Sequence, residues 1–270
     1  MSETLKAMQQ IETETLKAFI NVCEQLNLKY YVICGTLLGA VRHKGFIPWD
    51  DDIDVGMFRE DYNIFLEKGQ SLMPEGYFIQ TNVTDKEYPL NYAKIRNSNT
   101  TFIESSLKDK KINHGLYIDV FPLDYFPDGI LSKIFVEFKN GLMKSRISMM
   151  YSANWSWKHK LLRILSRRIY QDGYETVQKR NEYLASVPKS SLTRNYCGDW
   201  NEIAPADWFG EGVSLDFEDL KVVAPKEYDK YLTHVFGDYN TLPPIEERIP
   251  HHFTEVIDLD SPYTKYTEKA

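Results

Sequence analysis

The segment Trp49-Asp50-Asp51-Asp52-Ile53-Asp54-Val55-Gly56-Met57 restricts the fold and the chemistry of this 270-residue chain more than any other. Residues two apart in a strand share a face, so the alternation predicts a strand over residues 53–57. Ile53 and Val55 would face the core, and Asp52 and Asp54 would point together to the other side. Carboxylates packed in this way repel one another, and their burial is costly unless a cation neutralises them.

Paired carboxylates are good ligands for Mg²⁺ or Mn²⁺, which also take oxygens from phosphate and water. A third acid, Asp119, has apolar neighbours on both sides in another predicted strand, residues 116–121. We therefore predict a metal site formed by Asp52, Asp54 and Asp119, with phosphate chemistry as its purpose. Whether the two aspartates before Asp52 also bind metal, and whether the site holds one ion or two, stays open.

Two other interpretations of the acidic segment are a solvated loop and a calcium-binding EF-hand. Exposed turns rarely place acids between apolar residues, as Asp54 and Asp119 are placed. In an EF-hand, Asp50, Asp52 and Asp54 would be the first, third and fifth residues of the loop. The sixth residue must then be glycine, and this chain has Val55 there. The pattern therefore favours a metal-phosphate site.

Residues near the acidic segment are candidates for binding phosphate. A glycine and a threonine end a predicted strand over residues 30–34, where backbone N–H groups can approach a phosphate closely. Cations before Gly45, and others on a predicted strand over residues 92–96, would hold a polyphosphate against a metal ion. Charge pairing on the surface is the alternative for both groups of cations. The candidates are Gly35, Thr36, Arg42, His43, Lys44, Lys94 and Arg96.

Hydrophobic periodicity predicts a mostly β core flanked by helices, which is an α/β fold of the α+β kind. Asn27 is expected to end the first helix. Residues 37–42 are expected to form a helical turn. The remaining helices are expected over residues 3–27, 60–72 and within 130–187, and the remaining strands at 77–80, 101–103 and the ranges given above.

The chain is expected to form one compact unit with three sections. Residues 1–129 are the core, residues 130–194 are a basic helical insertion, and residues 195–270 return to the core. Residues 130–170 contain nine basic residues and one acidic residue, so the net charge of −7 leaves −15 for the rest of the chain. Such an acidic remainder disfavours nucleic-acid binding.

The basic insertion interleaves its cations with apolar residues, as a helix lying on a membrane surface does. The alternative is a helical subdomain whose apolar face packs on the core. The three cysteines are far apart and predict neither a disulfide framework nor a zinc site. We expect no signal peptide and no membrane-spanning segment, and therefore a cytoplasmic protein.

The residues quoted above carry a family resemblance. The run from Gly35 to Gly56 resembles the signature of the LicD family, whose members are bacterial phosphocholine transferases, with fukutin-type ribitol-phosphate transferases as relatives. The run from Tyr117 to Asp124 is similar to the second motif of that family. The segment Phe236–Tyr239 resembles its C-terminal motif, with phenylalanine where tyrosine is expected. Pro243, Pro244, Arg248 and His251 belong to the same C-terminal motif.

The resemblance implies a nucleotidyltransferase-like fold, with a small mixed sheet flanked by helices and a helical insertion. It also implies that phosphocholine passes from CDP-choline to a sugar hydroxyl of a teichoic-acid or other cell-surface glycan precursor. Mg²⁺ or Mn²⁺ is the implied cofactor, and Asp52, Asp54 and Asp119 are the implied catalytic residues. Asp119 would help to deprotonate the acceptor. A lipid-linked glycan acceptor would suit contact between the basic insertion and the inner membrane face.

Choline requires an aromatic cage, for which Trp49, Trp200 and Trp208 are candidates; core packing is the alternative for each. Other functions stay open beside phosphocholine transfer. The donor can be another CDP-alcohol, such as one carrying ribitol or glycerol phosphate. The enzyme can be a nucleotidyltransferase that releases pyrophosphate. A catalytically silent glycan-binding protein is the alternative from another class.

Overall fold

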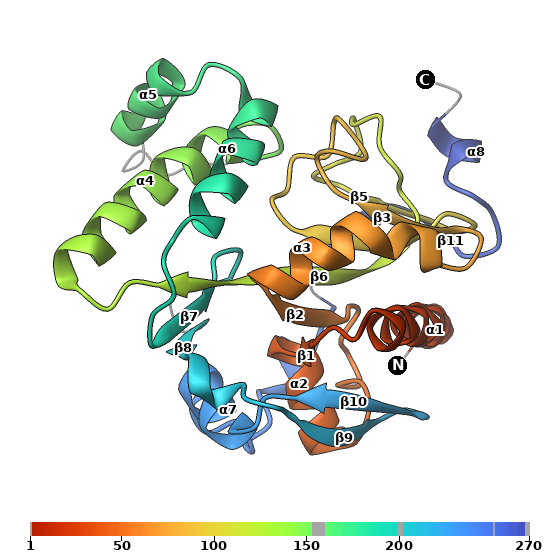
Figure 1. Ribbon diagram of the computed structural model, residues 1–270. Helices are drawn as coiled ribbons and strands as arrows, with labels where there is room; N and C mark the ends of the chain where they lie inside the picture. Colours follow the sequence, from red (N-terminus) through yellow and green to blue (C-terminus); the bar gives the residue numbers. More distant parts are fainter. Residues whose placement is uncertain (1, 153–159, 199–201, 251, 268–270) are drawn as a thin grey trace.

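The computed structural model describes residues 2–152, 160–198, 202–250 and 252–267 (Figure 1). Within them the largest sheet has seven strands and is mixed. Its central strand, β6 (Leu116–Phe126), is buried along almost its whole length. The other strands, from one edge, are β1 (Tyr31–Val32), β2 (Asp54–Phe58), then β6, β4 (Ala93–Asn97) and β3 (Tyr77–Gln80), with β7 (Leu192–Asn195) and β8 (Ile203–Pro205) extending from the far half of β6.

The register of the central strands places three charged residues in one row. β2 runs parallel to β6 and pairs Asp54 with Asp119. β4 runs antiparallel to β6 on its other side and pairs Lys94 with the same Asp119. Directly paired residues of adjacent strands share a face of the sheet, so the row Asp54–Asp119–Lys94 crosses three strands.

Helix α1 (Glu3–Leu26) covers the sheet and forms where the periodicity predicted it. The Ser2 side chain accepts a hydrogen bond from the N–H of Leu5 at its start, and Asn27 ends it in the left-handed conformation, as expected. Its apolar stripe packs into the main core, where Leu16, Phe19 and Val22 are fully buried.

One local prediction was wrong. Gly35 and Thr36 do not lie beyond the end of a strand; they lie in the first turn of α2 (Cys34–His43). The N–H of Ile33 bonds to the carbonyl of Asp54, and the carbonyl of Ile33 accepts from the N–H of Leu37. Sheet and helix hydrogen bonds therefore meet at one residue, and the expected strand over residues 30–34 shortens to β1.

The other early elements follow the sequence closely. The expected helix over residues 60–72 is α3 (Arg59–Lys68), followed by the 3₁₀ helix η1 (Gly69–Leu72). The expected strand over residues 101–103 is β5 (Thr101–Glu104). It pairs with β11 (Thr254–Asp258) in a separate two-stranded sheet, which brings the C-terminal segment back to the core.

The helical insertion lies between β6 and β7 and projects from the sheet on the side away from α1 (Figure 1). Its own small core joins Val136 and Leu184 to Phe126 of β6 and to Tyr196. The boundary expected at residue 194 falls inside β7. The helices are α4 (Ile130–Ser148), α5 (Lys160–Ile169) and α6 (Gly173–Ala185).

The return to the core is a series of short elements. No helix of the described residues is both long and apolar enough to cross a membrane. The elements are η4 (Ala206–Trp208), the hairpin of β9 (Val213–Phe217) and β10 (Leu220–Ala224), α7 (Tyr228–Phe236), η5 (Ile245–Glu247), β11 and α8 (Thr264–Thr267).

A buried ion pair fastens α3 to β6. Arg59 Nε donates to Asp124 Oδ1 at 2.7 Å, and its NH2 group donates to Asp124 Oδ2 at 2.6 Å. The Arg59 side chain is 10% exposed and the Asp124 side chain is 1% exposed. Both carboxylate oxygens are therefore satisfied by one planar guanidinium.

We predict that Asp124→Ala lowers the free energy of unfolding by about 3–5 kcal/mol, because it leaves a buried guanidinium without its partner. The control is Lys189→Ala, which breaks the exposed ion pair between Lys189 and Glu60 of α3. This variant should lower the free energy of unfolding by under about 1 kcal/mol. Urea denaturation measures both. Equal losses in the two variants would contradict the structural role of the Arg59–Asp124 pair.

Candidate active site

The predicted acidic residues come together at one face of the sheet. Ile53 and Val55 are fully buried, whereas Asp52 and Asp54 are partly exposed, so the alternation expected from the sequence is present. The register of β2 and β6 sets Asp119 directly beside Asp54. Burial, followed by the nearby carboxylates of Asp52 and Asp119, raises the pKa of Asp54 well above its usual range.

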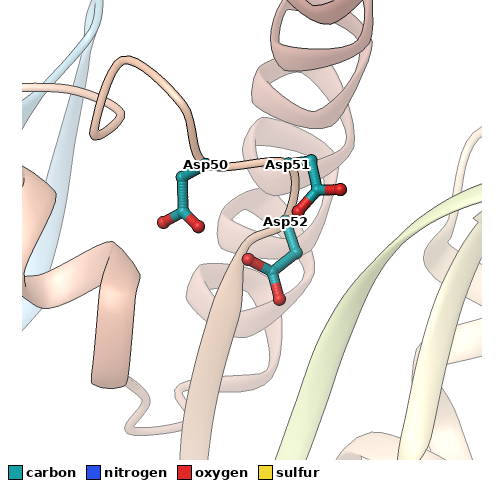
Figure 2. A group of neighbouring side chains, drawn as sticks. All are labelled: Asp50, Asp51 and Asp52. Atoms are coloured by element: carbon teal, nitrogen blue, oxygen red, sulfur yellow. The ribbon is translucent and has the colours of Figure 1, made fainter. Parts of the chain in front are cut away.

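The loop before β2 adds two carboxylates, Asp50 and Asp51, to that of Asp52. Asp50, Asp51 and Asp52 can each place one oxygen within 4.8 Å of the others, and Figure 2 shows them gathered where the loop enters β2. Asp50 and Asp52 share a hydrogen bond, which requires a proton on one of the two carboxyl groups. Burial and the charges of Asp52 and Asp51 raise the pKa of Asp50 to about 8.

Close packing against Asp50 explains one of the predicted glycines. A Cβ atom on Gly35 would lie 2.8 Å from Asp50 Oδ2, so only glycine lets α2 approach this carboxylate. The Thr36 hydroxyl accepts a hydrogen bond from the N–H of Asp54 at 2.7 Å. These two residues therefore shape the acidic site and connect α2 to β2.

His252 is a residue of the site that the sequence did not reveal. Its backbone N–H donates to Asp51 Oδ2 at 3.1 Å, and its Nδ1 lies 3.2 Å from Asp51 Oδ1. Burial alone would lower the pKa of His252. The hydrogen bond to Asp51 and the charges of Asp52 and Asp51 outweigh burial and raise it to about 9. The C-terminal segment thus delivers a cation to the acidic loop.

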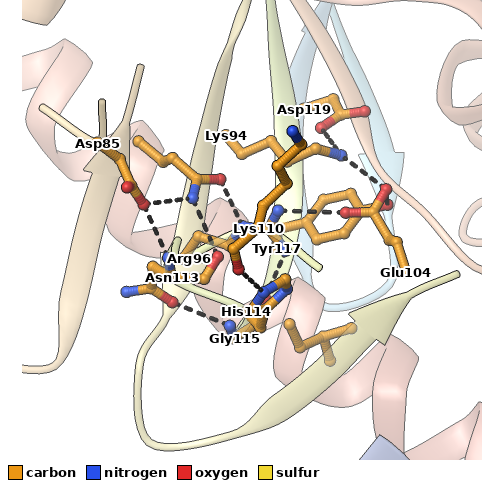
Figure 3. A network of polar contacts seen from close by, with 12 residues as sticks. Asp85, Lys94, Arg96, Glu104, Lys110, Asn113, His114, Gly115, Tyr117 and Asp119 are labelled. Atoms are coloured by element: carbon orange, nitrogen blue, oxygen red, sulfur yellow. Dashed lines mark hydrogen bonds and ion pairs between the residues drawn. The ribbon is translucent and has the colours of Figure 1, made fainter. Parts of the chain in front are cut away.

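On the other side of Asp119, a buried network holds the two cations of β4 (Figure 3). Lys94 Nζ lies 2.9 Å from Asp119 Oδ1, 3.7 Å from Glu104 Oε1 and 3.2 Å from the centroid of the Tyr117 ring. Arg96 is fully buried and donates to Gln80, to the carbonyl of Gly115 and to Glu104.

Glu104 is the acid that balances these cations. Burial would raise its pKa, but Lys94 and Arg96 lower it to about 2. The structure thus places Arg96 inside the protein, with three protein partners, and places Lys94 against Asp119. Lys94 therefore orients one of the three predicted metal ligands.

A cavity of about 940 Å³ opens beside the acidic residues. The first turn of α2 lines it through Cys34 and Gly35, and the N–H groups of a first helical turn attract anions. Cys34 adopts the left-handed conformation, with φ 48°, where the chain bends from β1 into α2. The other residues that line the cavity include Asp50, Asp52, Asp54, Glu202, His252, Arg42, Trp49, Phe236, Asp238 and Tyr239.

Arg42 is the predicted cation that lines this cavity. Its Nε donates to His43 Nε2 and its NH1 group donates to the carbonyl of Tyr239, both at 3.0 Å. These bonds use two of the five N–H groups of a guanidinium, so others can reach a ligand. Burial and the charge of Arg248 lower the pKa of Arg42.

The remaining predicted residues lie in different places. Trp49 lines the cavity, and the Arg248 guanidinium lies 5.3 Å from the centroid of its ring. Lys44 is exposed at the end of α2 and is not part of the lining. Trp208 packs at the edge of the main core, near the His234 ring. Trp200 lies outside the described residues.

The donor set fits a hard divalent cation. Asp52, Asp54 and Asp119 are carboxylates crowded at one place, where burial raises the pKa values of Asp54 and Asp119 and the charge of Asp52 raises both further. A bound divalent ion would offset the repulsion between these carboxylates. Oxygen atoms are the ligands that Mg²⁺ and Mn²⁺ prefer. The cavity beside them is large enough for a nucleotide-sized ligand.

Comparison with known proteins gives a family match. The pattern described as "LicD/FKTN/FKRP, nucleotidyltransferase domain" matches residues 27–172, more than half of the chain and all of the predicted metal ligands. The chain belongs to the LicD family. The mixed sheet with flanking helices also agrees with the α+β fold expected from the sequence.

Relatives within the LicD family have different activities in their names. The chain is 30% identical to the lipopolysaccharide cholinephosphotransferase LicD of Haemophilus influenzae over 277 aligned positions, which cover 95% of this chain and 98% of that protein. It is 26% identical to the ribitol 5-phosphate transferase FKRP of Mus musculus, over 44% of this chain and 22% of that protein. An uncharacterized protein of Rickettsia typhi is 41% identical over 37% of this chain and 30% of its own length.

We predict that stability without divalent ions falls as the pH rises from 5 to 9. The pKa of Asp50 is raised from 3.8 to about 8, so its contribution is complete at low pH and is lost as the pH rises through 8. The pKa of His252 is raised from 6.5 to about 9, so its contribution is present below 6.5 and is lost as the pH rises through 9.

Urea denaturation in EDTA across this range measures the effect. Asp50→Asn should reduce the fall at the lower pH values, and His252→Gln should reduce it at the higher ones. Added Mg²⁺ should flatten the wild-type profile, because a bound cation favours the ionised carboxylates. A wild-type profile that is flat in EDTA would contradict the proposed crowding of charge.

Proposed function

We propose that this protein is a metal-dependent transferase that moves phosphocholine from CDP-choline to a sugar hydroxyl of a cell-surface glycan precursor. The observation that carries the proposal is the pair Asp52 and Asp54, which lines a nucleotide-sized cavity beside Asp119. The similarity to a cholinephosphotransferase over nearly the whole of both chains supports the choline donor. Teichoic-acid precursors are one class of acceptor that fits the proposal.

In the proposed reaction, the acceptor oxygen attacks the phosphorus that bears choline, the bond from that phosphorus to CMP breaks, and CMP leaves with the electron pair. Bound Mg²⁺ or Mn²⁺ would neutralise the diphosphate oxygens and the charge that develops on CMP. Asp52, Asp54 and Asp119 would hold the cation. Asp119, oriented by Lys94, would help to take the proton of the acceptor hydroxyl.

The diphosphate would lie between this cation and the positive groups of the cavity. Arg42 and the first turn of α2 are on the cavity wall, and Arg248 lies close enough to Arg42 to lower the pKa of that residue. The two guanidiniums would favour an anionic ligand beside the acidic residues of the wall. An anion that binds there would relieve their mutual repulsion.

Choline would be recognised by the aromatic side chains of the cavity. Trp49, Phe236 and Tyr239 line it, and Asp238 adds a negative charge. The Trp49 ring has a guanidinium near its face, and choline would have to share or replace this cation–π contact. Trp208 is not part of this lining, so Trp49 is the tryptophan that the proposal retains.

The similarity to FKRP favours ribitol phosphate as a second candidate for the group transferred. A ribitol or glycerol group is uncharged and gains nothing from a cation–π contact. We therefore expect Trp49→Ala to raise the KM for CDP-choline about 2- to 30-fold, the equivalent of roughly 0.5–2 kcal/mol, and to leave the KM for CDP-ribitol unchanged if that donor is used.

The direct test is release of CMP from CDP-choline with Mg²⁺ and a glycan acceptor. Asp54→Asn should lower kcat by at least about 10²-fold, the usual scale for loss of one group that stabilises transition-state charge, without changing the circular dichroism spectrum. Removal of metal with EDTA should have the same effect. The control, Asp216→Asn, lies in the exposed β9–β10 hairpin and should keep wild-type activity.

Full activity of Asp54→Asn would remove the proposed metal site. Release of pyrophosphate from a nucleoside triphosphate, with no CMP from any CDP-alcohol, would identify a nucleotidyltransferase instead. Binding of glycan with neither product would identify the catalytically silent alternative.

The insertion exposes an apolar surface that supports contact with a membrane. Nine of the eighteen large apolar side chains exposed in the described residues belong to α4 and α5, which pack against each other. The expected packing on the core accounts only for other residues of α4, such as Val136, Leu142 and Ile147. The exposed residues are Ile130, Leu131, Ile134, Phe135, Phe138, Leu161, Ile164, Leu165 and Ile169.

The charges of the same helices favour an anionic lipid surface as the partner. Lys133 and Lys139 lie between the apolar residues of α4, and Arg167 and Arg168 are exposed on α5. Within the described parts of these two helices the acidic residue is Glu137, which forms an ion pair with Arg194. An interfacial helix needs this combination of exposed apolar side chains and positive charge. A lipid-linked acceptor would then be presented at the same surface.

Flotation with liposomes tests this part of the proposal. The protein should bind vesicles that contain phosphatidylglycerol and not vesicles of phosphatidylcholine alone, and the double variant Leu131→Ser/Phe135→Ser should lose binding. Val83→Ser, which changes another strongly exposed apolar residue, is the control and should bind normally. Equal binding to both kinds of vesicle, or no binding, would contradict a basic membrane-facing surface.

A further inference from the structure

Glu12 of α1 is a buried acid whose role the proposed reaction does not explain. Its side chain is 1% exposed. Both carboxylate oxygens are buried, and neither has a hydrogen-bond partner among the described residues. A buried carboxylate without partners is strongly unfavourable in a folded protein. Either a proton on Glu12 or a bound cation would relieve this cost.

The position of Glu12 faces the acidic loop. Three residues earlier on α1, the Gln9 side chain donates to the carbonyl of Asp50 at 2.8 Å, so the helix packs directly on this loop. Besides burial, the groups that raise the pKa of Glu12 are Asp52, Asp51, Asp50 and Asp119, in that order. The largest charge effects on the unpartnered Glu12 are therefore those of carboxylates.

The acidic loop offers further carboxylate ligands for a cation beside Glu12. Asp50, Asp51 and Asp52 can bring three oxygens within 4.8 Å of one another without Asp54 or Asp119. The main influences on Asp54 are Asp52, Asp119, Asp50 and Glu202, and Glu12 is not among them. The loop carboxylates are therefore a ligand set of their own, and the Gln9 contact places the α1 face that carries Glu12 against this loop.

We propose that Glu12 and the loop Asp50–Asp52 bind a second divalent cation, separate from the one that Asp52, Asp54 and Asp119 would hold. The ligands are hard carboxylate oxygens, so the cation is of the Mg²⁺, Mn²⁺ or Ca²⁺ class. This cation has a structural role: it neutralises the buried Glu12 and ties α1 to the loop that presents Asp52. The inference rests on the proposed function only in that Asp52 is common to both positions.

The binding of Mn²⁺ alone, measured by isothermal titration and electron paramagnetic resonance, tests the inference. Wild-type protein should bind two ions, Glu12→Gln should bind one, and Asp54→Asn should keep the ion at Glu12.

In EDTA, Glu12→Gln should be at least as stable as wild type, because it removes a repelled charge. With Mn²⁺ the wild type should gain more in Tm than the variant does.

Glu14→Gln, on the exposed face of the same helix, is the matched control and should bind two ions. Anomalous diffraction from wild-type crystals soaked in Mn²⁺ provides a measurement that does not depend on a variant, and should give a peak at Glu12. Wild-type binding and stabilisation in Glu12→Gln, or no anomalous peak at Glu12, would overturn the inference. If the inference fails in this way but Asp54→Asn loses the ion that Asp52, Asp54 and Asp119 would hold, the proposed function survives. Wild-type protein that binds no Mn²⁺ would overturn both.

Discussion

Repulsion among carboxylates that the fold forces together is the constraint on which this site depends. Parallel pairing of β2 with β6 fixes the backbone positions of Asp54 and Asp119 beside each other, because their strands are joined by backbone hydrogen bonds. The loop before β2 adds further acids at the same place. A protein retains such an arrangement only if something of opposite charge compensates it, and protein cations do so only in part.

Different protein cations compensate different carboxylates. Lys94 compensates Asp119 from β4, and His252 compensates Asp51 from the C-terminal segment. Asp52 and Asp54 instead face the cavity, where Arg42 and the first turn of α2 stand on the wall. The structure thus pairs Asp119 and Asp51 with protein cations and turns Asp52 and Asp54 toward a ligand. That division gives the cavity both a cation site and a binding surface for anions.

Local patterning predicted much of this arrangement. The alternation around Ile53 fixed which acids share a face, and the apolar neighbours of Asp119 marked it as a residue of a buried strand. What escaped prediction depends on distant pairings. Arg96 looked like a phosphate ligand, yet its partners are Gln80, Gly115 and Glu104 inside the protein. His252 reaches Asp51 across about two hundred residues of sequence, and no local pattern encodes such a contact. The contact of Gly35 with phosphate stays a prediction, and the close approach that the structure shows there is to Asp50.

The central claim is that Asp52, Asp54 and Asp119 share a cation that a nucleotide diphosphate also touches. Electron–nuclear double resonance of the protein with Mn²⁺ and CDP-choline measures this contact directly, through the coupling of the metal electron spin to phosphorus nuclei. The account predicts a phosphorus coupling in wild-type protein that disappears in Asp54→Asn. Bound nucleotide with no phosphorus coupling, or a coupling that persists unchanged in Asp54→Asn, would contradict it.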